Sequence, residues 1–391
     1  MKKIFSMLAA GSLLLLWNSC AKEDRIDHVD SSSHVPDQVS EVKVVATPGG
    51  AILTFKFPKD PQLAYVKATY EIQPGVIRET KTSVYSDTLV LEGFADTASH
   101  IVKVFSVGKN EKASAPLEVT VKPQRAPVFN AFDALTIEEA FGGVKIRVTN
   151  ANEANLAVVL MSDTANEAYY TPLQTFYSKS PEGVFSFRGL PPVEKKFAVY
   201  LRDRWGNRSD TLLKTITPLY EEAVPKPFVG LKLPTDEVTP VEPPYTMDRM
   251  WDGIIDGWIF ATRHSSSTPQ WFAFDLKKKV VISRMKLHQR GENYTYTGGN
   301  VKQFELWGSN NPDQDGGWVN WNYLGTFNSY KPSGPGTVTA EDKQYAAVDG
   351  EDFDLSFIPP AYRYVRFKTT ATWGGGPQIT ISELSFWGQI Q

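Results

Sequence analysis

The stretch QWFAFDL at residues 270–276 decides the fold, together with three later stretches of the same kind. These are FELWGSN at 304–310, RYVRF at 363–367 and ISELSFWG at 381–388. Alternation of apolar and polar residues, ended by a turn former, is typical of a β-strand with one buried face. The region around them holds eight of the ten tryptophans and is divided by Gly, Asn, Pro and Ser. It therefore predicts an all-β sandwich with long, chemically varied loops.

In this order, the four stretches resemble the discoidin domain, also called coagulation factor V/VIII type C or F5/8 type C, and its carbohydrate-binding-module relatives. The resemblance covers residues 246–391 and implies an eight-stranded, jelly-roll-like sandwich. Alternation also predicts which side chains pack between the sheets. These are Trp271, Phe274, Phe304, Leu306, Phe367 and Phe386.

Upstream, residues 36–124 and 125–218 each show short strand-like runs at the spacing of a seven-stranded sandwich. Gly49 matches Gly142 and Gly93 matches Gly189, at offsets of 93 and 96 residues, so one sandwich type is predicted twice in tandem. The strand order resembles fibronectin type III domains. The predicted fold class is thus all-β, with tandem immunoglobulin- or fibronectin III-like sandwiches followed by a discoidin-like one.

Residues 200–209 contain the second sandwich's sharpest local motif, YLRDRWGNRS. We favour a hairpin turn whose Trp205 packs on the domain junction, because Asp, Gly and Asn supply turn conformations. The alternative is a binding patch formed by Arg202, Trp205 and Arg208. Residues 219–245 carry six prolines, which predicts a stiff linker without sheet pairing and a domain boundary.

The N-terminus predicts export. Residues 1–19 form a signal peptide, with two lysines before an apolar run too short to span a bilayer. Cys20, the single cysteine, follows directly and resembles the lipidated residue of a Bacteroidetes-type lipoprotein. Residues 20–35 are polar and predict a flexible tether. The acidic pair Glu23-Asp24 resembles an export signal, which implies a lipid-anchored protein at the outer membrane, exposed on the cell surface.

The loops of the last third suit a sugar, because flat aromatic rings stack on pyranose C–H faces while polar side chains pair with hydroxyls. In discoidin-like folds such loops gather at one end, so the resemblance implies a ligand site there. The candidate ligand-binding residues are Arg290, Tyr294, Tyr296, Arg263, His264, Glu292, Asn293 and Trp373. A solvated loop cluster without a ligand is the alternative.

The resemblance also implies a possible structural Ca²⁺, for which Asp252, Asp256 and Glu383 would supply hard oxygen ligands. Ile254 departs from the family pattern, and Asp252 capping a turn is the alternative. No other cofactor is expected.

Composition excludes other classes of function. The formal charge of −3, without a basic cluster interleaved with aromatics, argues against nucleic acid. The sequence has no Gly-x-Ser-x-Gly elbow, and no spaced motif singles out a carboxylate pair among its 44 acidic residues, so we expect no enzyme.

The complete architecture resembles surface lipoproteins of Bacteroidetes polysaccharide-utilisation systems. We therefore expect a non-catalytic, cell-surface lipoprotein that binds an oligo- or polysaccharide through loops of its C-terminal domain. The alternative is a protein-binding adhesin or a scaffold subunit of an outer-membrane uptake complex. Expected partners are a glycan, the outer membrane through Cys20, and an outer-membrane transporter or glycosidase.

Overall fold

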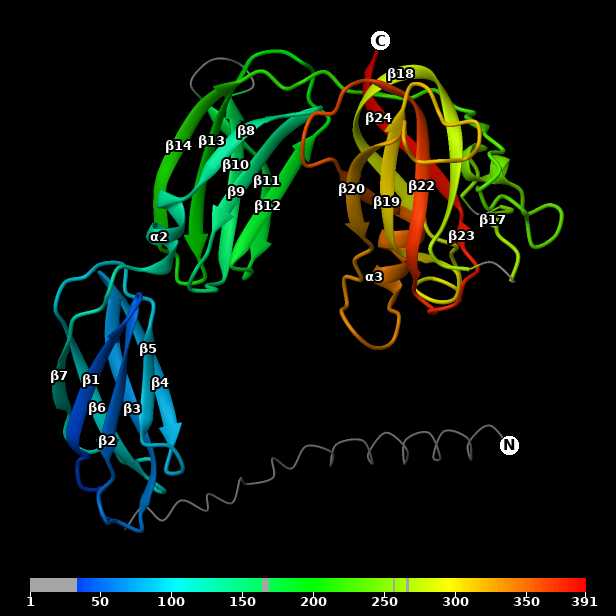
Figure 1. The fold of residues 1–391 in the computed structure, drawn as a ribbon. Helices are drawn as coiled ribbons and strands as arrows, with labels where there is room; N and C mark the ends of the chain where they lie inside the picture. Colours follow the sequence, from blue (N-terminus) through cyan, green and yellow to red (C-terminus); the bar gives the residue numbers. More distant parts are fainter. Residues whose placement is uncertain (1–33, 164–168, 256, 265–266) are drawn as a thin grey trace, which may run out of the picture.

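The computed structural model describes residues 34–391, except 164–168, 256 and 265–266. It consists of three β-sandwiches in series (Figure 1), and the first lies beside the second and away from the third. The predicted all-β fold class is confirmed. Cys20, the signal peptide and most of the tether lie outside the described residues.

The first sandwich packs a three-stranded sheet, in the order β1-β2-β5, on a four-stranded sheet, in the order β4-β3-β6-β7. The strands are β1 (Ser40–Thr47), β2 (Gly50–Lys56), β3 (Leu63–Gln73), β4 (Val76–Ser83), β5 (Thr88–Glu92), β6 (His100–Gly108) and β7 (Leu117–Val121). Alternation predicted six of these. It missed β4, an edge strand whose side chains are all exposed or half-buried, because such a strand carries no apolar face.

The second sandwich repeats this design, with sheets in the orders β8-β9-β12 and β11-β10-β13-β14. Its elements are α2 (Pro127–Asp133), β8 (Thr136–Ala140), β9 (Gly143–Thr149), β10 (Leu156–Asp163), β11 (Tyr170–Ser178), β12 (Glu182–Arg188), β13 (Lys195–Asp203) and β14 (Arg208–Ile216). Strand for strand, the topology equals that of the first sandwich. Gly49 and Gly142 both have φ +64° in the first hairpin, where an L side chain is disfavoured.

The third sandwich contains a large sheet in the order β15-β24-β18-β22-β19-β20, with β16 and β21 also paired to β18, and a small sheet β17-β23. The strands are β15 (Glu222–Ala223), β16 (Val229–Gly230), β17 (Phe260–Ala261), β18 (Gln270–His288), β19 (Val301–Ser309), β20 (Asn322–Asn328), β21 (Glu351–Asp354), β22 (Tyr362–Thr372), β23 (Thr380–Ile381) and β24 (Glu383–Ile390). The helical segments are η1 (Met247–Trp251), α3 (Ala340–Lys343) and η2 (Gln344–Gly350).

Strand β18 links both layers of this sandwich, because its first part pairs with β22 and its second part with β24. The change occurs at a register shift between Asp275 and Val280, where Lys277 has φ +65°. All predicted core residues are fully buried except Trp271. Trp271 has the opposite parity to Phe274 along the strand, so it points outward and packs edge-on against Trp318, with ring centroids 5.2 Å apart.

Residues 219–245 are not a free linker. β15 pairs with β24 and β16 pairs with β18, although the proline content predicted no pairing. Each paired segment is two residues long and free of proline, so the prolines cost no ladder hydrogen bond. Val224 and Phe228 are buried in the core of the third sandwich. From Glu222 onward this segment therefore belongs to the structure of the third sandwich, whereas Leu219 still pairs with Phe141 of the second.

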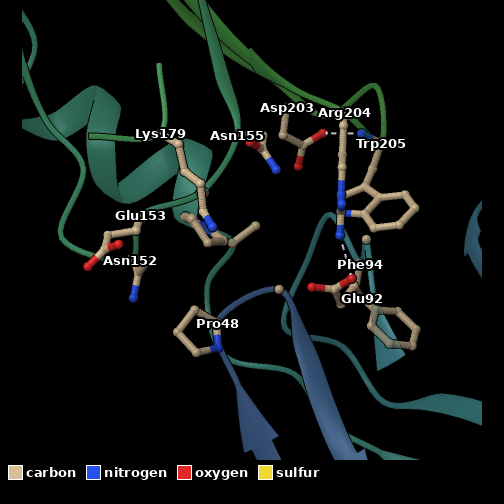
Figure 2. Close-up of a pocket in the computed structure, with 15 residues that line it drawn as sticks. Pro48, Glu92, Phe94, Asn152, Glu153, Asn155, Lys179, Asp203, Arg204 and Trp205 are labelled. Atoms are coloured by element: carbon tan, nitrogen blue, oxygen red, sulfur yellow. Dashed lines mark hydrogen bonds and ion pairs between the residues drawn. The ribbon is translucent and has the colours of Figure 1, made fainter. Parts of the chain in front are cut away.

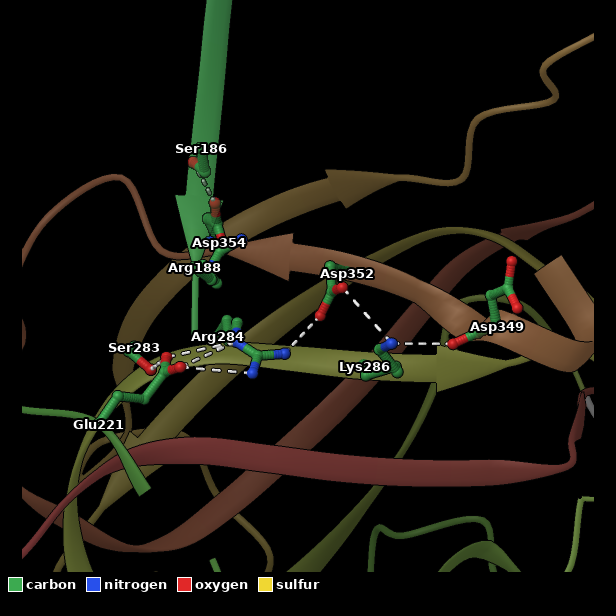
Figure 3. A network of polar contacts seen from close by, with 9 residues as sticks. All are labelled: Ser186, Arg188, Glu221, Ser283, Arg284, Lys286, Asp349, Asp352 and Asp354. Carbon is green, nitrogen blue, oxygen red and sulfur yellow. Dashed lines mark hydrogen bonds and ion pairs between the residues drawn. The ribbon is translucent and has the colours of Figure 1, made fainter. Parts of the chain in front are cut away.

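Apolar packing joins the first sandwich to the second, and polar contacts join the second to the third. At the first junction Trp205 packs against the first sandwich's core, as predicted for the turn at 203–209. Its ring lies 3.1 Å from the position that a Cβ on Gly93 would take. At the second junction Arg188 pairs with Asp354, and Glu221 accepts a hydrogen bond from Ser283 at 2.6 Å (Figure 3).

Within the described part of the chain, the helices are all too short or too polar to cross a membrane.

Candidate functional site

An aromatic cleft lies at the loop end of the third sandwich. Its volume is about 220 Å³. Its larger lining side chains include Tyr245, Trp258, Arg290, Glu292 and Tyr294, and we call this set the aromatic cleft. Three of them were predicted as ligand-binding residues from sequence. Two, Tyr245 and Trp258, were not.

The two aromatic walls of the cleft are accessible to solvent. Trp258 is 52% exposed and Tyr294 is 45% exposed. The Trp258 and Tyr245 rings pack edge-on, with centroids 5.2 Å apart, and this contact fixes the orientation of the indole. Large apolar rings normally leave water on folding, so two exposed rings lining one hollow make the cleft a candidate binding surface.

The Arg290 guanidinium supplies the cleft's positive charge. Its carbon lies 3.5 Å from the centroid of the Tyr294 ring, a cation–π stack that orients the donor fork. Among the described residues it forms no ion pair, so its N–H groups remain available to a ligand. Glu292 is exposed, has φ +55° and supplies acceptors at the same rim.

The loop at 289–300 is held by buried amides. Asn300 is 1% exposed, accepts from the Arg290 backbone N–H at 2.8 Å and donates to the Tyr294 carbonyl at 2.7 Å. Gln289 accepts from the Tyr296 backbone N–H at 2.8 Å and donates to Glu351 at 2.9 Å. These bonds fix Arg290 and Tyr294 relative to each other without a regular element.

Tyr296, a residue of this loop, packs against Trp373. Tyr296 is buried, and its phenol donates to the Tyr330 carbonyl at 2.7 Å. Burial raises the pKa of this phenol far above its ordinary value. Trp373 packs edge-on against the Tyr296 ring at 4.9 Å and donates to Ser329 at 3.1 Å. Both residues support the loop, and neither lines the aromatic cleft.

The remaining predicted residues lie apart from the cleft lining. Arg263 pairs with Glu237 at 3.0 Å, and His264 is exposed beside it. The backbone joins their loop to the residue before β23, because the Thr262 N–H donates to the Ile379 carbonyl. Asn293 is exposed next to Tyr294. The structure thus brings together Arg290, Glu292 and Tyr294.

The calcium candidates are partly engaged by cations. Glu383 contacts the Lys226 ammonium through Oε1, and its Oε2 is buried without a partner in the described part. Asp252 pairs with Arg249 at 3.3 Å and caps the Ile254 N–H. Burial raises the pKa of Glu383, which Lys226 opposes.

Ca²⁺ takes six to eight oxygen ligands. Outside the gaps at 1–33, 164–168, 256 and 265–266, no three acidic, histidine or cysteine side chains converge on one point. The described residues alone therefore do not fit the ion. Asp256 lies outside them, and calcium stays a prediction.

Sequence reasoning missed Trp258 and Tyr245 because neither belongs to a periodic stretch. The available signal was a tryptophan directly after the turn former Gly257, at the start of the short apolar run 258–261.

Three sequence families match the chain. Residues 36–123 match DUF4959, residues 124–227 match DUF5126 and residues 251–388 match DUF5000, and each is described as a domain of unknown function. No curated protein matches.

Several solved structures are similar. A SusE-like protein is 29% identical over 68% of this chain and 100% of its own, with a TM-score of 0.44. A family 32 carbohydrate-binding module from C. perfringens, solved with galactose, is 14% identical over 43% of this chain and 98% of its own, with a TM-score of 0.29. An F5/8 type C domain from Bacteroides fragilis is 10% identical over 42% of this chain and 99% of its own, with a TM-score of 0.30.

Proposed function

We propose that the protein is a non-catalytic, cell-surface glycan-binding lipoprotein, anchored through Cys20 and binding sugar in the aromatic cleft. One observation carries the proposal. Two exposed aromatic rings, Trp258 and Tyr294, line one hollow together with the guanidinium of Arg290, which forms no ion pair with any residue that the structure describes. This combination matches the two faces of a pyranose: an apolar C–H face for a ring, and hydroxyls for a fork of N–H donors.

The cleft's chemistry supports binding without turnover. Hydrolysis of a glycoside generally requires two carboxylates that flank the bond. The described lining of the aromatic cleft contributes Glu292 alone. A shallow site of this size should hold sugar at a Kd near the millimolar level, about −4 kcal/mol. Many anchored copies on one cell would raise the avidity for a polymeric glycan.

Affinity electrophoresis against plant, host and microbial polysaccharides identifies a ligand, and calorimetry with its oligosaccharides then measures affinity. Trp258→Ala and Arg290→Ala should each weaken binding about tenfold or more, equal to about 1.4 kcal/mol, because each removes a direct contact. Tyr85→Ala is the matched control, since Tyr85 is 95% exposed on the first sandwich.

Two outcomes would overturn the proposal. One is the absence of retention across all three polysaccharide classes. The other is a glycan affinity that Trp258→Ala and Arg290→Ala leave at the level of Tyr85→Ala. A stable protein partner captured equally by all variants would instead favour a scaffold subunit of an uptake complex.

A further inference from the structure

The second sandwich carries a cleft of its own, on the sheet β11-β10-β13-β14. Its volume is about 570 Å³, within the usual range of small-molecule sites. We call it the basic cleft, after the five residues used below: Asn155, Ala157, Tyr177, Lys179 and Arg202. It adjoins a second hollow of about 550 Å³ at the first domain junction, in which Figure 2 shows Lys179 and Asn155 beside the 203–205 turn.

Strand register builds the floor of the basic cleft. Ala157 on β10 pairs with Tyr177 on β11 and with Arg202 on β13, so the three side chains form one row across the sheet. The row lies on the outer face, because the neighbouring Leu156 and Leu201 point into the core.

The central alanine leaves a hollow between two large side chains. Tyr177 and Arg202 stand two strands apart, about 9–10 Å at the backbone. Tyr177 is 74% exposed, so its ring is free to stack on a ligand. Trp205 is excluded from this role, because Arg78 and Arg204 lie over its ring at 4.2 and 4.4 Å.

Some charged side chains that line the basic cleft already have partners within the protein. Arg204 pairs with Glu92 at 2.6 Å. The Asp203 carboxylate accepts from the backbone N–H groups of Trp205 and Asn207, at 2.8 and 3.0 Å, and so belongs to the turn.

By contrast, the two cations on the cleft walls have no anionic partner. Within the described ranges, neither Lys179 nor Arg202 forms an ion pair or a side-chain hydrogen bond. Two uncompensated cations facing one hollow favour an anionic ligand.

We propose that the basic cleft binds an anionic saccharide, a pyranose that bears a carboxylate or a sulfate. The Tyr177 ring stacks on the apolar face of the sugar, and the Arg202 guanidinium pairs with the anionic group. Lys179 and Asn155 bind the ligand at the rim of the cleft. Uronates and sulfated sugars share this chemistry, and the probes below distinguish them. The site is on a different sandwich from the aromatic cleft and does not depend on it.

Calorimetry on the purified protein tests the site, in an Arg290→Ala background that weakens the aromatic cleft. The probes are an oligogalacturonate, its neutral methyl ester and a sulfated galactan oligosaccharide. At least one anionic probe should bind about tenfold more tightly than the ester, and its affinity should fall as salt rises. Binding of the oligogalacturonate identifies uronates as ligands, and binding of the sulfated probe identifies sulfated sugars.

Arg202→Gln and Tyr177→Ala should each weaken that binding about tenfold. Lys278→Ala is the control, because it removes an exposed charge of the same sign from the third sandwich. Since Arg202 and Tyr177 are exposed, the melting temperatures of their variants should match that of the parent. The proposal is overturned if neither anionic probe binds, if the ester binds equally, or if Arg202→Gln has no more effect than Lys278→Ala.

Discussion

At the residue scale, His288 ends strand β18, directly before the loop at 289–300, and is held by residues of η2. Its ring is 6% exposed, with Nδ1 3.1 Å from the Ala347 carbonyl. Gly350 lies against the ring, where an added Cβ would approach Nε2 to 2.6 Å. Burial lowers the pKa of His288, with the Ala347 hydrogen bond acting in the opposite direction. Folding therefore disfavours the protonated form of His288.

This gives a pH dependence with a definite sign. Below about pH 6.5 the unfolded chain binds a proton at His288 that the folded chain does not, so stability falls as pH drops. Between pH 7 and pH 5, His288→Gln should lose less melting temperature than the parent protein. His264→Gln, an exposed histidine in the same sandwich, serves as the control. Equal slopes for the parent and His288→Gln would contradict the assignment.

At the element scale, the proline-rich segment at 219–245 is secured by a buried ion pair. Asp236 lies 3.2 Å from Arg366 of β22, and both side chains are inaccessible to solvent. The Arg366 guanidinium lies between Trp318 and Trp321, 4.5 Å from each ring. Asp236 also accepts from the Ala273 backbone N–H at 3.0 Å. The segment thus behaves as an edge of the third sandwich.

Removing one partner of such a pair leaves an uncompensated buried charge. Asp236→Ala should therefore lower the free energy of unfolding by about 3–5 kcal/mol, measured by urea denaturation with tryptophan fluorescence. Replacing both partners, as Asp236→Ala with Arg366→Met, should recover part of this loss. Glu237→Ala breaks the exposed pair with Arg263 and should cost less than about 1 kcal/mol. A cost for Asp236→Ala as small as that control's would refute the role of the pair.

At the scale of the whole molecule, polar contacts connect each sandwich to the next. Asn207 is 3% exposed, donates to the Gly93 carbonyl at 3.2 Å and accepts from Gln73 at 2.8 Å. At the second junction Glu221 joins Arg284 of β18, which also pairs with Asp352 at 2.6 Å (Figure 3). Interfaces within a chain are loose by default unless they are well packed, so we expect these bonds to restrict the movement of neighbouring sandwiches.

Asn207→Ala should loosen the first junction, because it leaves the Gly93 carbonyl and the Gln73 amide without partners. We expect a larger radius of gyration in small-angle X-ray scattering, with unchanged circular dichroism. Asn152→Ala is the matched control, since Asn152 is exposed in the same sandwich. Identical scattering curves for the two variants would show that Asn207 does not hold the junction.

The sequence by itself determined the parts of the fold that follow a local period. Phe274, Phe304 and Phe367 were placed in the core because side chains alternate between the faces of a strand, and one face must be dry. The tandem sandwiches were visible because equivalent hairpins need the same left-handed glycine, at Gly49 and again at Gly142. Residue chemistry within a single loop predicted Arg290 and Tyr294 as ligand-binding residues, and both line the aromatic cleft.

Tertiary structure alone decided which loop residues meet. Tyr296 and Tyr294 lie two positions apart, yet one phenol is buried on Tyr330 and the other ring faces solvent. Trp258 joined the aromatic cleft, and Ala157 opened the basic cleft, through partners distant in sequence. A loop has no period, so the exposure of its side chains depends on which distant segments pack against it.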